Sequence, residues 1–151
     1  GVEDIPSAPG RNALKPGEVI SAITLPPRGK HGGDAYLRFI PRTEMDIAVA
    51  SAAVNLTLDV GGHITAARVA LGAVAPKVVL VEAAAKAIIG TRLDDAALGA
   101  LAVACEAACN PIDDKRGTIV FRTSTAGVLA RRAALIAYAR AQNAANAGVS
   151  K

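Results

Sequence analysis

The sequence predicts an α+β fold in which a mostly antiparallel sheet of three to four strands carries three helices on one face. Apolar and polar residues alternate over 47–59, which is the period of a half-buried strand. A Gly61-Gly62 pair and a second extended stretch at 63–73 follow, and together they indicate a hairpin. Beyond residue 82 the apolar spacing becomes helical. Strands followed by helices are typical of α+β domains.

The segments before this hairpin are rich in proline and glycine. Residues 1–16 show little periodicity and are predicted to form a loop. Residues 18–25 alternate weakly and are predicted to form a strand, which ends at Pro26-Pro27 because proline has no N–H group for the ladder. Residues 28–33 are a polar connector. Residues 36–40 are predicted to be extended, since Pro41 disfavours helix at the residue before it.

Within the hairpin, one face of the 47–59 strand is predicted to be apolar and the other polar. The apolar face holds Ala48, Ala50, Ala52, Val54, Leu56 and Leu58, and the polar face holds Ser51, Asn55 and Thr57. Residues 72–76 then form a turn. Residues 78–81 are either a further short strand or the start of a helix.

Three helices are predicted after residue 81. The first spans 82–89 and ends at Gly90. The second begins after an Asp94 N-cap and ends at Asn110-Pro111, with a buried stripe of Leu98, Leu101, Cys105 and Ala108. The third spans 117–146, frays from residue 144 onward, and exposes Arg131 and Arg140. Its predicted buried face consists of Phe121, Val128, Leu135 and Ile136, with Leu129 alongside.

Composition excludes several function classes. The chain is 52% hydrophobic but only 3% aromatic, so the core should consist largely of alanine and β-branched residues. No run of about 18 apolar residues indicates a membrane span, and no secretory leader opens the sequence. The net charge is +4, but the basic residues are dispersed, whereas nucleic-acid-binding proteins concentrate them in a stripe or interleave them with aromatic residues.

The cysteines and histidines do not indicate a metal site. Cys105 and Cys109 are four residues apart on one face of a helix, where a disulfide is geometrically poor and two ligands are too few for a closed zinc or iron–sulfur site. They are predicted to be buried free thiols, which suggests a cytoplasmic location. His31 and His63 are predicted to be solvated surface residues.

The strongest candidate for a binding site is the polar cluster at 36–46. Tyr36, Arg38 and Arg42 fall within seven residues, and Glu44 and Asp46 follow just before the apolar strand. Arginine is a planar, permanently charged donor suited to anions and to electron-rich ring edges. Asp46 is expected to hold one arginine through a bidentate pair. From the residues alone, an ion-paired start of a strand with no ligand is the favoured interpretation.

This cluster resembles a signature of a known family. Tyr36-Leu-Arg-Phe-Ile-Pro-Arg-Thr-Glu-Met-Asp-Ile-Ala48 is similar to the aromatic-x-Arg/Lys-x-x-x-Arg-x-x-x-Asp-Ile-Ala motif in the C-terminal domain of the flavoprotein (medium) subunit of molybdenum hydroxylases. That family includes carbon monoxide dehydrogenase and xanthine dehydrogenase. Further similarities follow in the family's order: the segments 9–18 and 23–26, the 69–76 turn, Asp113-Asp-Lys-Arg-Gly117 with Phe121-Arg122, and Leu129-Ala-Arg-Arg-Ala133.

The resemblance implies a role in an FAD site with no catalytic residue and no metal ligand in this chain. The position of Arg38 lies beside the flavin and would raise its electron affinity. Ile20 would be an apolar flavin contact, Tyr36 holds the aromatic position, and Arg42 and Asp46 match a polar loop near the isoalloxazine edge. Phe121 stands where tyrosine is usual, so any role of that hydroxyl is absent.

The resemblance also implies a division of the chain and a set of partners. Residues 1–28 would be the trailing segment of a missing FAD-binding domain, 29–147 the flavoprotein C-terminal domain, and 148–151 a disordered tail. The glycine-rich pyrophosphate loops of the family are absent, so the chain alone should bind FAD weakly or not at all. It would be a fragment or a split-gene product.

In the family, electrons pass from a molybdenum cofactor in a large subunit, through [2Fe–2S] clusters in a small subunit, to FAD. They then reach NAD, a quinone or another acceptor. This chain would therefore partner an FAD-binding domain or chain, the iron–sulfur small subunit and the molybdopterin large subunit. The alternative is a non-catalytic assembly module whose helices dock partner subunits.

Overall fold

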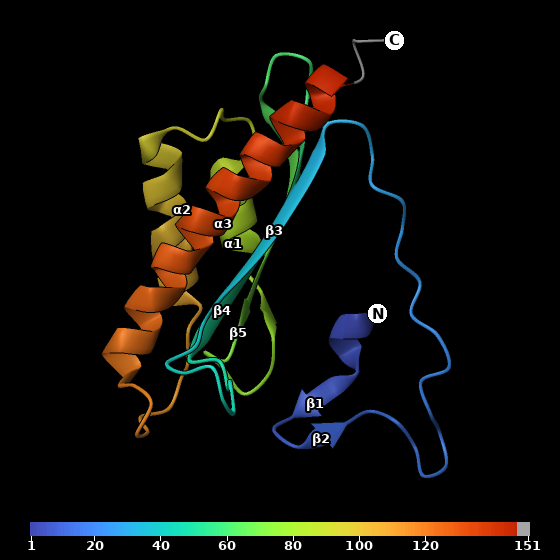
Figure 1. The fold of residues 1–151 in the computed structure, drawn as a ribbon, viewed down its shortest axis with the longest axis vertical. Coiled ribbons are helices and arrows are strands. Elements are labelled where there is room, and N and C mark those ends of the chain that lie inside the picture. The colour runs from blue at the N-terminus through green and yellow to red at the C-terminus, as the bar shows by residue number, and fades with distance from the viewer. Residues whose placement is uncertain (148–151) are drawn as a thin grey trace.

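The computed structural model describes residues 1–147 and has one four-stranded antiparallel sheet with three helices on one side (Figure 1). The strands, in spatial order, are β3 (Gly32–Phe39), β4 (Ala50–Leu58), β5 (Ile64–Gly72) and β6 (Val79–Leu80). The helices are α1 (Glu82–Ile88), α2 (Asp95–Ala107) and α3 (Ile119–Ala147). Helix α3 lies along β3 and β4, α1 packs on β5, and α2 packs on α1 and α3. The predicted α+β fold is confirmed.

The central hairpin agrees closely with the prediction. The predicted apolar face of β4 is buried from Ala50 to Leu58, while Asn55 is exposed on the other face. Ala48 is only half-buried, and Ser51 is buried despite its place on the predicted polar face. The turn contains Gly62 with a positive φ of 82°, a conformation that glycine adopts without strain. The 78–81 segment is a short strand, β6.

The N-terminal region differs from the prediction. Residues 1–16 hold a short 3₁₀ helix, η1 (Val2–Asp4), and a small hairpin of β1 (Pro6–Ala8) and β2 (Arg11–Asn12). The predicted strand at 18–25 is wrong, because the segment pairs with no strand among the described residues and exposes Val19, Ile20, Ile23 and Leu25. An alternating pattern forms a strand only when a neighbouring backbone accepts its hydrogen bonds.

Strand β3 starts at Gly32, four residues before the predicted extended piece at 36–40, and takes in the end of the expected 28–33 connector. The two glycines at its start are buried, and Gly33 lies against α3. A Cβ added to Gly33 would lie 2.0 Å from the Ala137 carbonyl oxygen. Glycine is therefore required for α3 to approach the strand this closely.

The predicted buried face of α3 is wrong. The four residues assigned to it are partly exposed, with exposed fractions between 37% for Ile136 and 49% for Leu135. The observed buried face is built almost entirely of alanine: Ala126, Leu129, Ala130, Ala133, Ala134, Ala137 and Ala141. Small side chains fit because the glycines of β3 bring the strand close to the helix. Leu129 was placed correctly, and Arg131 and Arg140 are exposed as predicted.

The other two helices follow the prediction. The carboxylate of Asp94 accepts a hydrogen bond from the Ala97 N–H at 2.8 Å, so it caps α2. Leu98, Leu101 and Cys105 are buried as predicted, but Ala108 and Cys109, also predicted to be buried, are only half-buried near the end of the helix. Both cysteines are free, and burial raises the pKa of the Cys105 thiol to about 12, which makes it unreactive. Helix α3 remains regular to Ala147, and the predicted tail at 148–151 lies outside the described residues.

The two histidines occupy different environments. His63 is half-exposed and lies 3.4 Å from the Asp59 carboxylate. His31 was predicted to be solvated, but it is half-buried and its Nδ1 is enclosed without a hydrogen-bond partner among the described residues. None of the helices within 1–147 combines the length and hydropathy of a membrane-spanning helix.

Candidate functional site

The helices cover only one face of the sheet, and the opposite face carries the predicted cluster. Strand pairing aligns Tyr36 with Ala53 and Ala53 with Ala70, which form one row of side chains across three strands. The next row consists of Arg38, Ser51 and Gly72. The centre of this open face is therefore a floor of small residues, with an aromatic ring and a guanidinium group at one edge.

A cavity of about 870 Å³ lies over the first of these rows. Its walls include Tyr36, Asn55 and Arg68 from the sheet and Leu25 from the N-terminal segment. The Arg68 guanidinium lies 3.7 Å from the Glu3 carboxylate, so the N-terminal segment approaches this face. In Figure 1 that segment, in blue, runs on the side of the sheet away from the helices.

The predicted pairing of an arginine with Asp46 is present, but it is not bidentate to the carboxylate. The Arg38 guanidinium donates one hydrogen bond to the Asp46 carboxylate and a second, at 3.4 Å, to the Asp46 backbone carbonyl. Both side chains remain accessible, with exposed fractions of 42% and 50%. Asp46 therefore holds Arg38 at the end of β3 while leaving part of its guanidinium open to a ligand.

The structure does not bring all five predicted site residues together. Tyr36 lines the cavity over the sheet, and Arg38 with Asp46 stands beside it at the next row. Arg42 instead lines a separate groove between the 41–47 and 114–116 loops. Ile20 lies in an apolar cavity of about 360 Å³ with Val2 and Ile5. The site therefore reduces to Tyr36, Arg38 and Asp46 around the small-residue floor.

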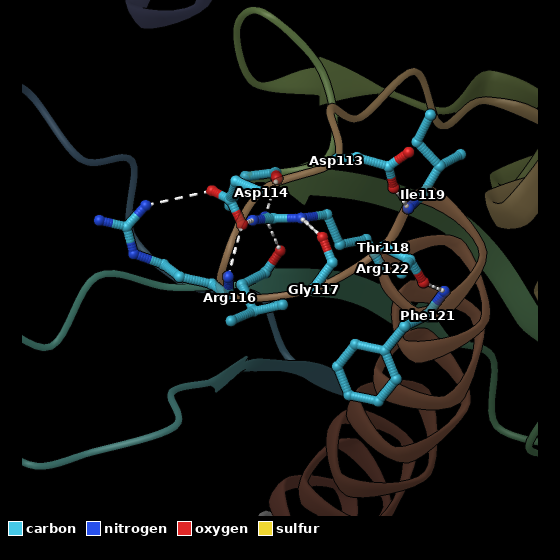
Figure 2. A network of polar contacts seen from close by, with 10 residues as sticks. Asp113, Asp114, Arg116, Gly117, Thr118, Ile119, Phe121 and Arg122 are labelled. Atoms are coloured by element: carbon cyan, nitrogen blue, oxygen red, sulfur yellow. Dashed lines mark hydrogen bonds and ion pairs between the residues drawn. The ribbon is translucent and has the colours of Figure 1, made fainter.

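Arg122 anchors the neighbouring loop and was not predicted as part of the site. It is the first-turn arginine of α3, yet only 4% of it is exposed. Its guanidinium donates to the Val49 carbonyl at 2.8 Å, the Asp114 carboxylate at 2.6 Å and the Gly117 carbonyl at 3.3 Å. Figure 2 shows this guanidinium between Asp114 and Gly117. The only sequence signal was the Asp113–Gly117 motif followed by Phe121-Arg122.

This network favours the ionised form of Asp114. The backbone N–H of Arg116 and the Arg122 guanidinium lower the pKa of its carboxyl to about 2. Through Asp114, Arg122 ties the 113–117 loop to Val49, which follows the loop bearing Asp46. The Phe39 and Phe121 rings reinforce this junction, since they meet edge to face with centroids 5.8 Å apart.

No group of three metal-ligating side chains lies together in the part of the chain that the structure describes. Near the floor, the open face offers small apolar side chains, the Tyr36 ring and the Arg38 guanidinium held by Asp46, and Arg68 adds a second cation to the cavity wall. Such a surface suits a planar ring system that carries or gains negative charge.

Comparisons with known proteins agree with this geometry. Residues 35–137 match the CO dehydrogenase flavoprotein C-terminal domain family. The carbon monoxide dehydrogenase medium chain of Afipia carboxidovorans is 40% identical over 131 residues, which cover 87% of this chain and 45% of that relative. The chain thus spans about half the length of the curated relatives it matches.

Solved structures give the same result. The reconstituted CO dehydrogenase from Oligotropha carboxidovorans superposes with a TM-score of 0.85 at 37% identity, over 91% of this chain and 48% of the other. Quinoline 2-oxidoreductase from Pseudomonas putida 86 superposes with a TM-score of 0.76 at 25% identity, over 95% of this chain and 48% of the other.

Proposed function

The chain belongs to the family of CO dehydrogenase flavoprotein C-terminal domains, and from this premise we propose that it forms one wall of an FAD site in an oxidoreductase. The observation that carries the proposal is the open sheet face, where a floor of small residues adjoins Tyr36 and the Arg38–Asp46 pair. An isoalloxazine ring would need a flat surface to lie on and a positive charge at its edge. The floor of small residues and the partly exposed guanidinium beside it offer both.

The residues fit the ring part of FAD better than its phosphates. The small side chains of Ala53 and Ala70 leave space above the sheet. In the next row, Gly72 has no side chain, and a Cβ there would lie only 2.6 Å from the Ser51 hydroxyl oxygen. By contrast, the sequence has no glycine-rich pyrophosphate loop of the dinucleotide-binding kind. FAD binding would therefore need a second part, either a domain or another chain.

Each site residue has a physical role in this proposal. Arg38 places a positive charge beside the ring and raises its affinity for electrons. Asp46 positions the Arg38 guanidinium, and Tyr36 offers a ring edge beside the floor. Arg42 and Ile20 are predicted flavin neighbours that lie further away in this chain, and they would reach the cofactor only if the loop or the N-terminal segment moved. Bound FAD would supply the redox chemistry.

The proposed assembly is that of a molybdenum hydroxylase. FAD would receive electrons from [2Fe–2S] clusters in a small subunit, which receive them from a molybdenum cofactor in a large subunit. The acceptor would be NAD, a quinone or another oxidant. The matched relative is a medium chain, which denotes one subunit of a larger enzyme. The free cysteines fit a cytoplasmic location, which stays part of the proposal.

Residues 1–28 are proposed to belong with the FAD-binding part. Their 18–25 segment exposes Val19, Ile23 and Leu25 and has no strand partner among the described residues. A strand of the FAD-binding part would pair with this backbone and cover these side chains. The matched relatives are about twice as long as this chain, so their additional residues are numerous enough to form an FAD-binding domain.

The test is to co-express the chain with an FAD-binding part of the family and to measure bound flavin and its reduction potential. Arg38→Ala should lower the potential by about 20 mV or more, because a unit charge at about 4 Å is worth about 1 kcal/mol in water, and 30 mV corresponds to about 1.4 kcal/mol for two electrons. Arg38→Lys should restore most of the potential. Arg131→Ala, on the exposed side of α3, is the matched control.

An unchanged potential and flavin content in Arg38→Ala would refute the role of Arg38. The complex failing to retain flavin at all would favour the second candidate, a non-catalytic docking module. One observation supports that candidate: α3 exposes Val120, Val128 and Leu135, which are apolar side chains directed away from its own core. Capture of an iron–sulfur or molybdopterin subunit without flavin would then be the expected result.

A further inference from the structure

A second groove lies outside the proposed flavin site, between the loop after β3 and the loop before α3. It has a volume of about 490 Å³, which is within the usual range of small-molecule sites. Arg42 lies on one wall, and Lys115 and Arg116 lie on the other, together with Asp114. Three cations and one carboxylate therefore face the same space.

The carboxylate is already engaged. Asp114 accepts hydrogen bonds from the Arg116 backbone N–H at 2.8 Å, the Arg116 guanidinium at 3.1 Å and the Arg122 guanidinium at 2.6 Å. The buried charge of Arg122 thus compensates Asp114 from behind the groove. The positive charge of the groove is not cancelled by its only carboxylate.

Two of the cations have no partner. Neither Arg42 nor Lys115 makes a hydrogen bond or ion pair with any residue between 1 and 147. The nearby acids are committed elsewhere or lie outside the groove: Asp46 binds Arg38, and Asp113 accepts a hydrogen bond from the Ile119 N–H. Glu44 does not line the groove.

The remaining wall is apolar. Pro41, Met45 and Ile47 line the groove, and Met45 and Ile47 are 74% and 51% exposed. An exposed apolar wall beside unpaired cations is complementary to a molecule with both an apolar and an anionic part. Met45 also has a positive φ of 49°, which turns the loop so that this wall faces the basic one.

We propose that this groove binds a small phosphate-bearing molecule, with the phosphate on Arg42 and Lys115 and its apolar part on Met45 and Ile47. Guanidinium and ammonium groups are the strongest side-chain donors to phosphate oxygens. The proposal does not depend on the flavin site, because both walls belong to this chain and no cofactor takes part.

The sequence offers a single-signal probe of the groove. Met45 is the one methionine in the 151 residues, so methyl-¹³C-methionine labelling gives one resonance for the chain, assigned by its loss in Met45→Leu. Phenyl phosphate, inorganic phosphate and phenol are titrated into the labelled chain. Phenyl phosphate should shift the resonance saturably, inorganic phosphate should bind more weakly, and phenol should produce no saturable shift.

The variant Arg42→Gln with Lys115→Gln should weaken phenyl phosphate binding by about tenfold or more, because both charged donors are lost. The matched control, Arg92→Gln with Arg131→Gln, removes the same charge from exposed positions elsewhere, and should change binding by less than about twofold, since distant exposed charges are screened. Equal weakening in both double variants, no saturation, or equal shifts with phenol and phenyl phosphate would each overturn the proposal. Circular dichroism spectra that match the wild type show that the variants are folded.

Discussion

Replacing Arg122 with alanine should destabilise the fold more than any surface change. The side chain is 4% exposed and makes its two shortest hydrogen bonds to the Val49 carbonyl at 2.8 Å and the Asp114 carboxylate at 2.6 Å. Its removal leaves the buried Val49 carbonyl without a donor, whereas Asp114 keeps its hydrogen bonds from Arg116. A buried acceptor that loses its donor typically costs about 1–3 kcal/mol.

The assay is urea unfolding followed by circular dichroism, with thermal melting alongside. At about 2–4 °C per kcal/mol for a chain of this size, the melting temperature should fall by about 2–12 °C. Arg122→Lys should recover part of the loss, because an ammonium group retains the charge but cannot donate as a planar fork. Arg131→Ala on the same helix should change stability by less than about 0.5 kcal/mol.

A double-mutant cycle separates the ion pair from the other contacts of Arg122. The effects of Asp114→Ala and Arg122→Ala should be non-additive when combined, because the two groups share one network. A loss below about 1 kcal/mol in Arg122→Ala, or strict additivity in the cycle, would refute the view that this network fixes the 113–117 loop.

Three further predictions concern stability. The pKa of Asp114 is about 2 in the folded chain, below its ordinary value of 3.8. The ionised carboxylate therefore stabilises the fold fully above pH 3.8, and this stabilisation is lost as the pH falls toward 2. Asp114→Asn should flatten the pH dependence of stability to urea between about pH 4 and pH 2. Gly33→Ala should cost about 2 kcal/mol or more in thermal melting, since the new Cβ would lie 2.0 Å from the Ala137 carbonyl oxygen; Gly99→Ala in α2, with no atom within 4 Å, should instead stabilise by about 0.5–1 kcal/mol. Asp94→Ala should cost about 1 kcal/mol by loss of its N-cap, whereas Asp95→Ala should cost a few tenths.

The elements that could be predicted from the sequence are those whose signals are local. The β4–β5 hairpin follows from alternation over neighbouring residues and a glycine pair between them. Helix α2 follows from the Asp94 cap and a stripe three to four residues apart. The Arg38–Asp46 pair also joins residues that are close in sequence, since the acceptor lies eight positions after the donor.

The features that could not be predicted depend on distant parts of the chain. Arginine is usually solvated, and the burial of Arg122 depends in part on a carbonyl 73 positions away that accepts a hydrogen bond from it. Residues 18–25 have the alternating pattern of a strand, but a local pattern cannot show whether the fold provides a second strand to pair with them. Ile20 and Arg42 matched the family motif, yet the fold places them in cavities separate from Tyr36.

The orientation of α3 links these errors to the geometry of the site. Large apolar residues mark the buried face of most helices, but Gly33 allows α3 to lie so close to β3 that only alanine fits between them. The same close contact brings the start of α3 to the end of β3, where Phe121 meets Phe39 and Arg122 reaches Val49. The loop that carries Asp46 lies between those two anchor points. The position of Arg38 on the open face is therefore set in part by an alanine-lined helix on the opposite face.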